Sequence, residues 1–173
     1  MVSIGEWNGA TPPASMTDVG NCSKFDAEVT EQTLDHFSSR SGLKTKDKSV
    51  TIEIGYNLTF DLDEISVNNL KLFLKGSLTG TRIIRANTVL DAEYALQFQS
   101  DNPVGPNEKW EFWRMKLSPA GGFSLISDEW SKLSFKGTGL ADTANHSTSP
   151  YFTVTFGTTT TTTTSTTTTT TTD

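Results

Sequence analysis

The 173-residue sequence predicts a mainly β protein, with two packed antiparallel sheets in a sandwich or barrel-like fold and one short flanking α-helix. Two observations support this prediction. Several segments alternate apolar and polar residues with a period of two, as half-buried antiparallel strands do. A single segment instead has apolar residues at the three-to-four-residue spacing of an amphipathic helix.

Residues 1–17 are predicted to form an irregular N-terminal arm, because Gly9, Pro12 and Pro13 disfavour both a helix and a central strand. The arm carries Trp7, whose large side chain needs a place to be buried. Two alternatives stay open: Trp7 folds back on its own domain, or it lies on a neighbouring subunit. The main β domain is expected at residues 18–157.

A period-two pattern starts near Lys24 and becomes clearest over residues 50–61. There Val50, Ile52 and Ile54 begin a series of alternating apolar residues that continues to Phe60. This pattern predicts a strand with one buried and one wet face. Since the usual strand has about 5–6 residues, this one is expected to extend past the body of the domain or to cross a large sheet.

The segment 33–48 is polar, with turn-forming residues and isolated apolar ones. As a hairpin arm with ~7 residues each way, it would project ~20 Å or more. Phe37 and Leu43 would then be exposed unless a partner covers them, which favours a binding role.

One short helix is predicted after Ser66, a good N-cap residue, and before Gly76, a good C′ residue. Its expected buried face is Val67, Leu70, Phe73 and Leu74. Further strands are predicted over residues 89–99, 109–117 and 151–156, with a turn or loop at 101–107. Residues 123–137 are predicted to form either one long strand or two shorter ones around Asp128.

Composition restricts the function. The net charge of -6, the pI near 4.9 and the lack of a Lys/Arg-rich run argue against a protein that binds nucleic acid through basic charge. The single cysteine, Cys22, excludes an intrachain disulfide and is expected to be a small, partly buried strand residue. No signal peptide and no run of ~18 apolar residues is evident, so we expect folding in a reducing cytoplasm and no membrane span.

The end of the sequence is of low complexity. From residue 158 to residue 172 it is threonine, broken only by Ser165. We expect this Thr-rich tail, residues 158–173, to be solvated and extended and to build no core. Attachment of sugar to it is a further hypothesis.

Catalytic and metal-binding motifs are absent from the sequence. His36 and His146 lie on separate segments and are expected to be solvated, and no metal-ligand spacing occurs. No nucleophile motif is present, and carboxylate pairs such as Asp26/Glu28 are expected to form a solvated face. Trp110 and Trp113 would point to opposite faces of one strand and so cannot form one flat sugar-binding platform without a bulge. We therefore expect no enzyme, no metal and no cofactor.

Several stretches between Asp18 and Gly76 resemble the major tail tube proteins of bacteriophages with long, non-contractile tails. The order is distinctive: a strand, a loop with Ser-Ser-Arg-Ser-Gly-Leu-Lys at 38–44, a long strand, an acidic turn and a helix that contains Asn-Asn-Leu. The resembling segments are residues 19–25, 38–44, 50–52, 59–64 and 68–70, and the stretch from Asp18 to Gly76 that contains them is about a third of the chain.

The resemblance implies a structural virion protein, synthesised in the cytoplasm of the host bacterium. Homohexameric rings would stack into a tail tube, with a continuous β-barrel lining a lumen that conducts phage DNA during ejection. The implied partners are further copies of the chain, the tape measure protein and DNA in the lumen, and the tail terminator and tail tip proteins, with no membrane.

Two sets of residues follow as site candidates. Contacts between subunits or rings are expected from the N-terminal arm and the 33–48 loop, namely Trp7, His36, Phe37, Arg40, Leu43 and Lys44. An acidic lumen would repel phosphate within a Debye length of ~8–10 Å. Its candidates on the wet strand faces are Asp26, Glu28, Glu53, Asn57 and Asp61.

Two other functions stay open. The tryptophans and the Thr-rich tail are compatible with a secreted β-sandwich binding module, such as one for carbohydrate, with a Thr-rich linker. The tube subunit of a contractile injection machine would share the tube architecture, and the sequence discriminates poorly between it and a non-contractile tail.

Overall fold

A computed structural model describes residues 1–8, 10–40, 42–126, 128 and 130–157. These residues form a mainly β structure with antiparallel pairing and one short helix, which confirms the predicted fold class. The Thr-rich tail predicted at 158–173 lies outside the described residues. The strands are β1 Val2–Glu6, β2 Thr17–Asp18, β3 Cys22–Ser38, β4 Thr45–Leu62, β5 Ser77–Thr79, β6 Ile83–Arg85, β7 Glu93–Gln99, β8 Asn107–Pro119, β9 Leu133–Gly139 and β10 Phe152–Gly157, and the helix is α1 Val67–Phe73.

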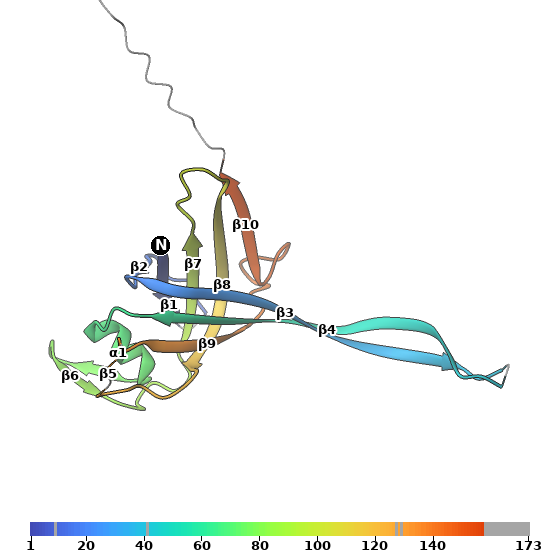
Figure 1. Cartoon of the computed structure of the whole chain (residues 1–173), viewed down its shortest axis with the longest axis horizontal. Coiled ribbons are helices and arrows are strands. Elements are labelled where there is room, and N and C mark those ends of the chain that lie inside the picture. Colours follow the sequence, from blue (N-terminus) through green and yellow to red (C-terminus); the bar gives the residue numbers. More distant parts are fainter. Residues whose placement is uncertain (9, 41, 127, 129, 158–173) are drawn as a thin grey trace, which may run out of the picture.

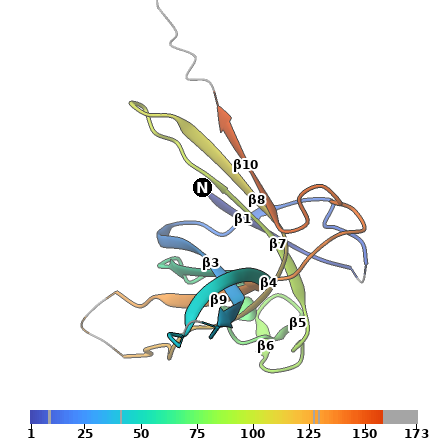
Figure 2. The ribbon, with the colours of Figure 1, turned by 90° about the vertical axis from the view of Figure 1, so that its right-hand side faces the viewer.

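Eight strands form one hydrogen-bonded sheet that folds into two facing layers. Its order is β2-β1-β7-β8-β9-β4-β3, and β10 pairs with β8. Residues 107–112 of β8 pair with β10, whereas residues 115–119 pair with β9, so β8 joins both layers. In Figure 1, β3, β4 and β9 run across the view and β7, β8 and β10 cross behind them. Figure 2, turned by 90°, shows the two groups as separate layers.

The core lies where the two layers cross. Leu58, Phe60 and Leu62 of β4 alternate with solvent-facing residues and are each 0–1% exposed. The Phe25 ring, on β3, lies 5.9 Å from the Phe60 ring and 5.3 Å from the Phe98 ring of the other layer. Stacked aromatic rings therefore join β3 and β4 to β7 across the interior.

Helix α1 begins as predicted and ends one residue earlier than predicted. The Ser66 hydroxyl accepts a hydrogen bond from the Asn69 backbone N–H, as an N-cap does. The predicted face is confirmed for Phe73, which is buried, and for Leu70 and Leu74, which pack half-buried against the core. It is wrong for Val67, which is 43% exposed. Leu72 and Asn69 are buried in addition, and the Asn69 amide turns inward to donate to the carbonyls of Val19 and Glu64.

The helix ends in a Schellman arrangement. Lys75, with φ 47°, takes the left-handed C′ position that was predicted for Gly76. The Gly76 N–H donates to the Lys71 carbonyl and the Lys75 N–H to the Leu72 carbonyl. Gly76 is required next to it for space, since a Cβ there would lie 2.7 Å from the Arg85 carbonyl oxygen.

The prediction of an irregular arm over residues 1–17 is wrong for its first part. Val2–Glu6 is strand β1, which lies inside the sheet between β2 and β7. The residues that disfavour regular structure all follow it, so they end the strand without preventing it. Trp7 is 8% exposed, and its Nε1 donates to the Trp113 carbonyl at 2.8 Å. The structure thus favours the alternative in which Trp7 folds back on its own domain.

The strand predicted over residues 123–137 is shorter and later, at Leu133–Gly139. Strand β9 finds partners in residues 57–62 of β4 and 115–119 of β8, and both ladders begin at residues 133–135. None of the described residues of segment 123–132 pairs with a strand, and the apolar side chains of Leu125 and Ile126 are exposed.

We expect Phe60→Ala to lower the free energy of unfolding by about 3–5 kcal/mol, because it removes a buried ring from the layer crossing. Phe156→Ala, at a side chain that is 65% exposed, should cost about 1 kcal/mol or less. Urea denaturation of both variants measures the difference. If both variants lost the same free energy of unfolding, the placement of the core at the layer crossing would be contradicted.

Candidate assembly surface

Strands β3 and β4 continue beyond the body of the domain as a two-stranded ribbon (Figure 1). Residues 30–38 of β3 span about 30 Å at ~3.3 Å per residue. This confirms the predicted projection, but the segment 33–48 is mostly regular strand, with the turn confined to residues between Ser38 and Thr45. Register shifts after Gln32 and after His36 mark two bulges that twist the ribbon.

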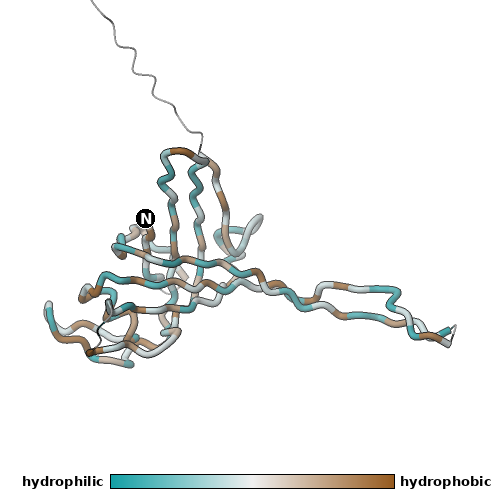
Figure 3. Tube along the Cα trace, viewed as in Figure 1, coloured by the Kyte–Doolittle hydropathy of each residue, from teal (hydrophilic) through white to brown (hydrophobic). Residues whose placement is uncertain are grey.

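Besides the residues of its tip, the ribbon has five apolar side chains that are exposed in the isolated chain. Alternation predicts that the face with Val50, Ile52 and Ile54 is buried along its whole length. It is fully buried only from Leu58 onwards, while Tyr56 is half-buried against Tyr151 and Phe152 and the three residues before it on this face are exposed. Figure 3 shows apolar segments on both strands of the ribbon. The exposed fractions are between 47% and 64% for Val29, Leu34, Val50, Ile52 and Ile54.

The tip of the ribbon brings together five of the six predicted contact residues. Phe37 and Leu43 are exposed, and the Lys44 ammonium lies 4.8 Å from the centre of the Phe37 ring. His36 Nδ1 lies 2.6 Å from the Asp47 carboxylate. Arg40 is also exposed at this end. The sixth residue, Trp7, lies apart from the tip and is buried in the body, as described above.

The ribbon is locally basic although the chain is acidic. Segment 33–48 carries four basic residues, Arg40, Lys44, Lys46 and Lys48, against Asp35 and Asp47, whereas the chain has 14 Lys and Arg and 20 Asp and Glu. Lys46 lies 2.7 Å from Asp35. Its hydrogen bond, with a second one from Ser49, holds the pKa of the Asp35 carboxyl below its usual value. The other three basic residues make no ion pair with a described carboxylate.

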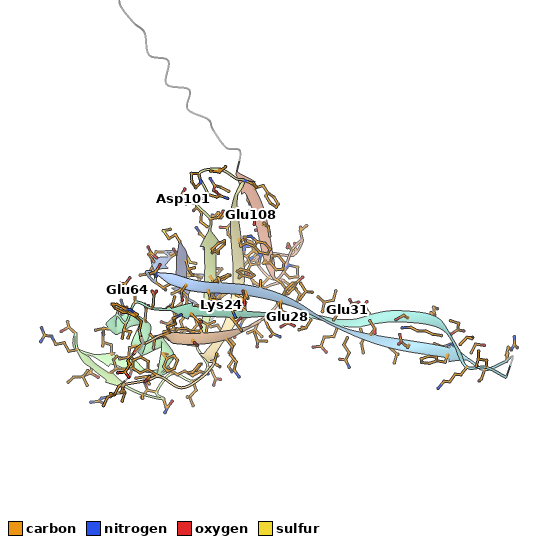
Figure 4. All side chains as sticks on the ribbon, in the orientation of Figure 1. Lys24, Glu28, Glu31, Glu64, Asp101 and Glu108 are labelled. Carbon is orange, nitrogen blue, oxygen red and sulfur yellow. The ribbon has the colours of Figure 1, made fainter. Side chains whose placement is uncertain are left out.

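Four of the five lumen candidates lie together on the outer face of β3 and β4. Asp26 and Glu28 are exposed on β3, and Asn57 lies opposite Glu28 and near Asp61 on β4. Figure 4 labels Lys24 and Glu28 along β3. The fifth, Glu53, lies farther out on the ribbon, opposite Gln32.

This face is not uniformly acidic. Lys24 lies 2.9 Å from Asp26, and Lys136 of β9 lies opposite Thr59. The hydrogen bond and the charge of Asp26 raise the pKa of the Lys24 ammonium. Asp26 is therefore partly neutralised, and Glu28 and Asp61 supply most of the negative charge on the face.

The sheet leaves a long open edge. Strand β3, with 17 residues, pairs with β4 on one side and with no other strand among the described residues. An unpaired row of backbone N–H and C=O groups can pair with another chain. The open edge and the exposed apolar ribbon are thus continuous parts of one candidate assembly surface.

The remaining candidates are structural. His146 is not solvated as predicted: its ring stacks on Trp113 at 3.8 Å between centroids, and Nδ1 lies 2.7 Å from the buried Asp142 carboxylate. Burial alone would raise the pKa of Asp142, but hydrogen bonds with His146 and Asn145 bring it below its usual value. Trp110 stacks on Phe152, so it and Trp113 do point to opposite faces of β8.

Two absences hold for the residues that the structure describes. No group of three or more His, Cys, Asp or Glu side chains could hold a metal ion. No helix in this part of the chain is long and apolar enough to cross a membrane.

Comparison with known proteins gives a family and similarities among solved structures. A family model described as Protein of unknown function UCP028589 matches residues 1–90 and 79–155. No curated protein matches the chain. A match among solved structures is the tube-terminating cap of the anti-feeding prophage, with 11% sequence identity and a TM-score of 0.39. That match covers 90% of this chain and 88% of the cap chain.

Replacing residues 32–53 by Asn-Gly should leave the body folded, since the pair Glu31 and Ile54 would then flank a two-residue turn. None of the residues removed belongs to the core. We expect the free energy of unfolding to change by about 1 kcal/mol or less. Urea denaturation measures the free energy of unfolding, at protein concentrations too low for the chain to assemble.

A longer replacement serves as the control. Removing residues 26–59 deletes Leu58 from the core and should abolish cooperative unfolding. Loss of cooperative unfolding in the shorter variant as well would show that the ribbon is needed for folding and not reserved for assembly.

Proposed function

The chain belongs to the family described as Protein of unknown function UCP028589, and we propose that it is the major tail tube subunit of a tailed bacteriophage. In this proposal homohexameric rings stack into a tube, and phage DNA passes through the lumen during ejection. The single observation that carries the proposal is the exposed apolar ribbon that continues the open edge of β3. The sequence resemblance over residues 18–76 supports it.

The energetics of the ribbon favour a closed assembly over a simple dimer. Fully burying a Val, Leu or Ile side chain stabilises by ~1.5–3 kcal/mol, so covering the exposed half of all five adds roughly 4–8 kcal/mol. Association costs about 4–15 kcal/mol in lost freedom of motion. One ribbon contact alone gives at best a weak pair, whereas each subunit of a ring makes two such contacts.

Ring closure would also cover the open edge of β3. The outer edge of β3 carries unpaired backbone groups along 17 residues. In a ring these groups pair with the next subunit, and no edge stays open to unspecific pairing. A closed sheet of this kind would place one face of β3 and β4 toward a central channel.

The outer face of β3 and β4 suits a channel for DNA. Glu28 and Asp61 would oppose contact with phosphates, and Asp26 adds to them although Lys24 partly neutralises it. The partners proposed with this function are the tape measure protein in the lumen and the terminator and tip proteins at the tube ends. The role is structural, without catalysis or cofactor, in the virion tail.

The first test is negative-stain electron microscopy of the purified chain, with light scattering. We expect rings or tubes with a central hole. The triple variant V50T/I52T/I54T keeps β-branched side chains but reduces the apolar surface of the ribbon, so it should remain monomeric.

The matched control is Val104→Thr, an exposed apolar side chain in the loop between β7 and β8. It should assemble as the parent chain does. A parent chain that stays monomeric at high concentration, even with virion tails as seeds, would overturn the proposal.

The channel itself can be tested by charge. Assembled tubes of the double variant D26K/E28K should retain DNA at low salt and release it as salt rises, because added lysines attract phosphate and release counterions. Tubes of the parent chain should not retain DNA. Co-sedimentation over a salt series measures this, and equal retention by both tubes would place these residues outside the lumen.

A further inference from the structure

A second exposed apolar surface lies at the end of the folded molecule that is opposite to the ribbon tip. Trp130 is 91% exposed, the largest apolar side chain left open to this degree among the described residues. Together with Ile65 it lines an open groove whose other lining residues are Asp63, Asp128 and Ser131. We name these five residues the Trp130 groove. Figure 4 labels the neighbouring Glu64 at this end of the body, far from the ribbon.

The groove and the ribbon tip are complementary in chemistry. The tip presents the apolar side chains Phe37 and Leu43, with the cations Arg40 and Lys44. The groove offers an aromatic ring and an isoleucine beside two carboxylates. Apolar contact with opposite charge around it is the usual composition of a specific protein interface.

One chain cannot bring its own tip to its own groove. Strand β4 begins at the tip with Thr45 and ends at Leu62, and the groove residue Asp63 follows immediately. At ~3.3 Å per residue, the 18 residues of β4 hold the two surfaces about 60 Å apart. The occupant of the groove must therefore belong to another molecule.

We propose that the ribbon tip of one copy docks into the Trp130 groove of a second copy, as the contact between successive rings. The inference rests on the proposed function and names the receiving surface. The two surfaces differ and lie at opposite ends of the chain, so the contact is head-to-tail and extends as a filament. The basic tip is the part of this acidic chain best suited to the acidic groove.

Cross-linking tests the contact directly. In a Cys22→Ser background, chains with Leu43→Cys are mixed with chains carrying Ser131→Cys and oxidised mildly. A disulfide-linked pair should form at least ten times faster than between Leu43→Cys and Val104→Cys. The residue Val104 is 92% exposed and lies outside both surfaces, so it controls for chance encounters. Equal rates in the two mixtures overturn the proposal.

Charge reversal supplies an independent readout. Arg40→Glu should give rings that do not stack, and a second change, Asp128→Lys, should restore tubes in the double variant. Trp130→Ala should also stop at rings, while Val104→Ala stacks normally. Electron microscopy counts tubes against rings. Stacking by Trp130→Ala, or no restoration in the double variant, counts against the groove as the receiving surface.

The two proposals fail differently. If the parent chain forms tubes but the cross-link is no faster than its control, the docking inference is wrong and the tube function stands. If the parent chain forms neither rings nor tubes, the tube function is wrong. The cross-linking rate in that same sample then decides the docking contact alone: a fast link supports it, and a slow link overturns it.

Discussion

The pairing of β4 with two different neighbours is the constraint on which the remaining structure depends. Residues 57–62 lie between β3 and β9, with Leu58 and Phe60 buried below them. The same strand continues outward with β3 as its one partner strand among the described residues. Because the inner part is held on both sides and packed, the outer part can project as a ribbon. The base of the ribbon touches the body where Tyr151 donates a hydrogen bond to the Ile54 carbonyl and packs on Tyr56. The core and the candidate assembly surface are therefore two parts of one strand.

The sequence predicts much of this fold, because alternation is a direct record of strand structure. It predicts the long strand at residues 50–61 and its excess length. It does not show where the covering layer ends, since Ile52 and Leu58 have the same place in the pattern but only Leu58 is buried. That difference depends on strands far away in the sequence. Strand β1 escaped prediction because it is short and the turn-forming residues after it dominate its neighbourhood.

Of the two surfaces proposed to meet, the sequence predicted the ribbon tip but not the Trp130 groove. The tip residues are consecutive, so their grouping follows from a hairpin, and the structure brings Phe37, Leu43 and Lys44 together. The Trp130 groove joins residues 63–65 to residues 128–131, and no local pattern links these segments. The sequence predicted a regular strand over 123–137, and a regular strand gave no sign that Trp130 is exposed.

The long ladder between β3 and β4 also has a mechanical meaning. Sixteen register pairs connect the two strands from the body to the tip. A pull along the ribbon loads these pairs together in shear, whereas a pull across it would break them one after another from the end. A tube whose axial tension runs along such ribbons resists stretching, and the two bulges still let each ribbon bend. Stiffness along one direction and compliance in the others would then come from a single hairpin.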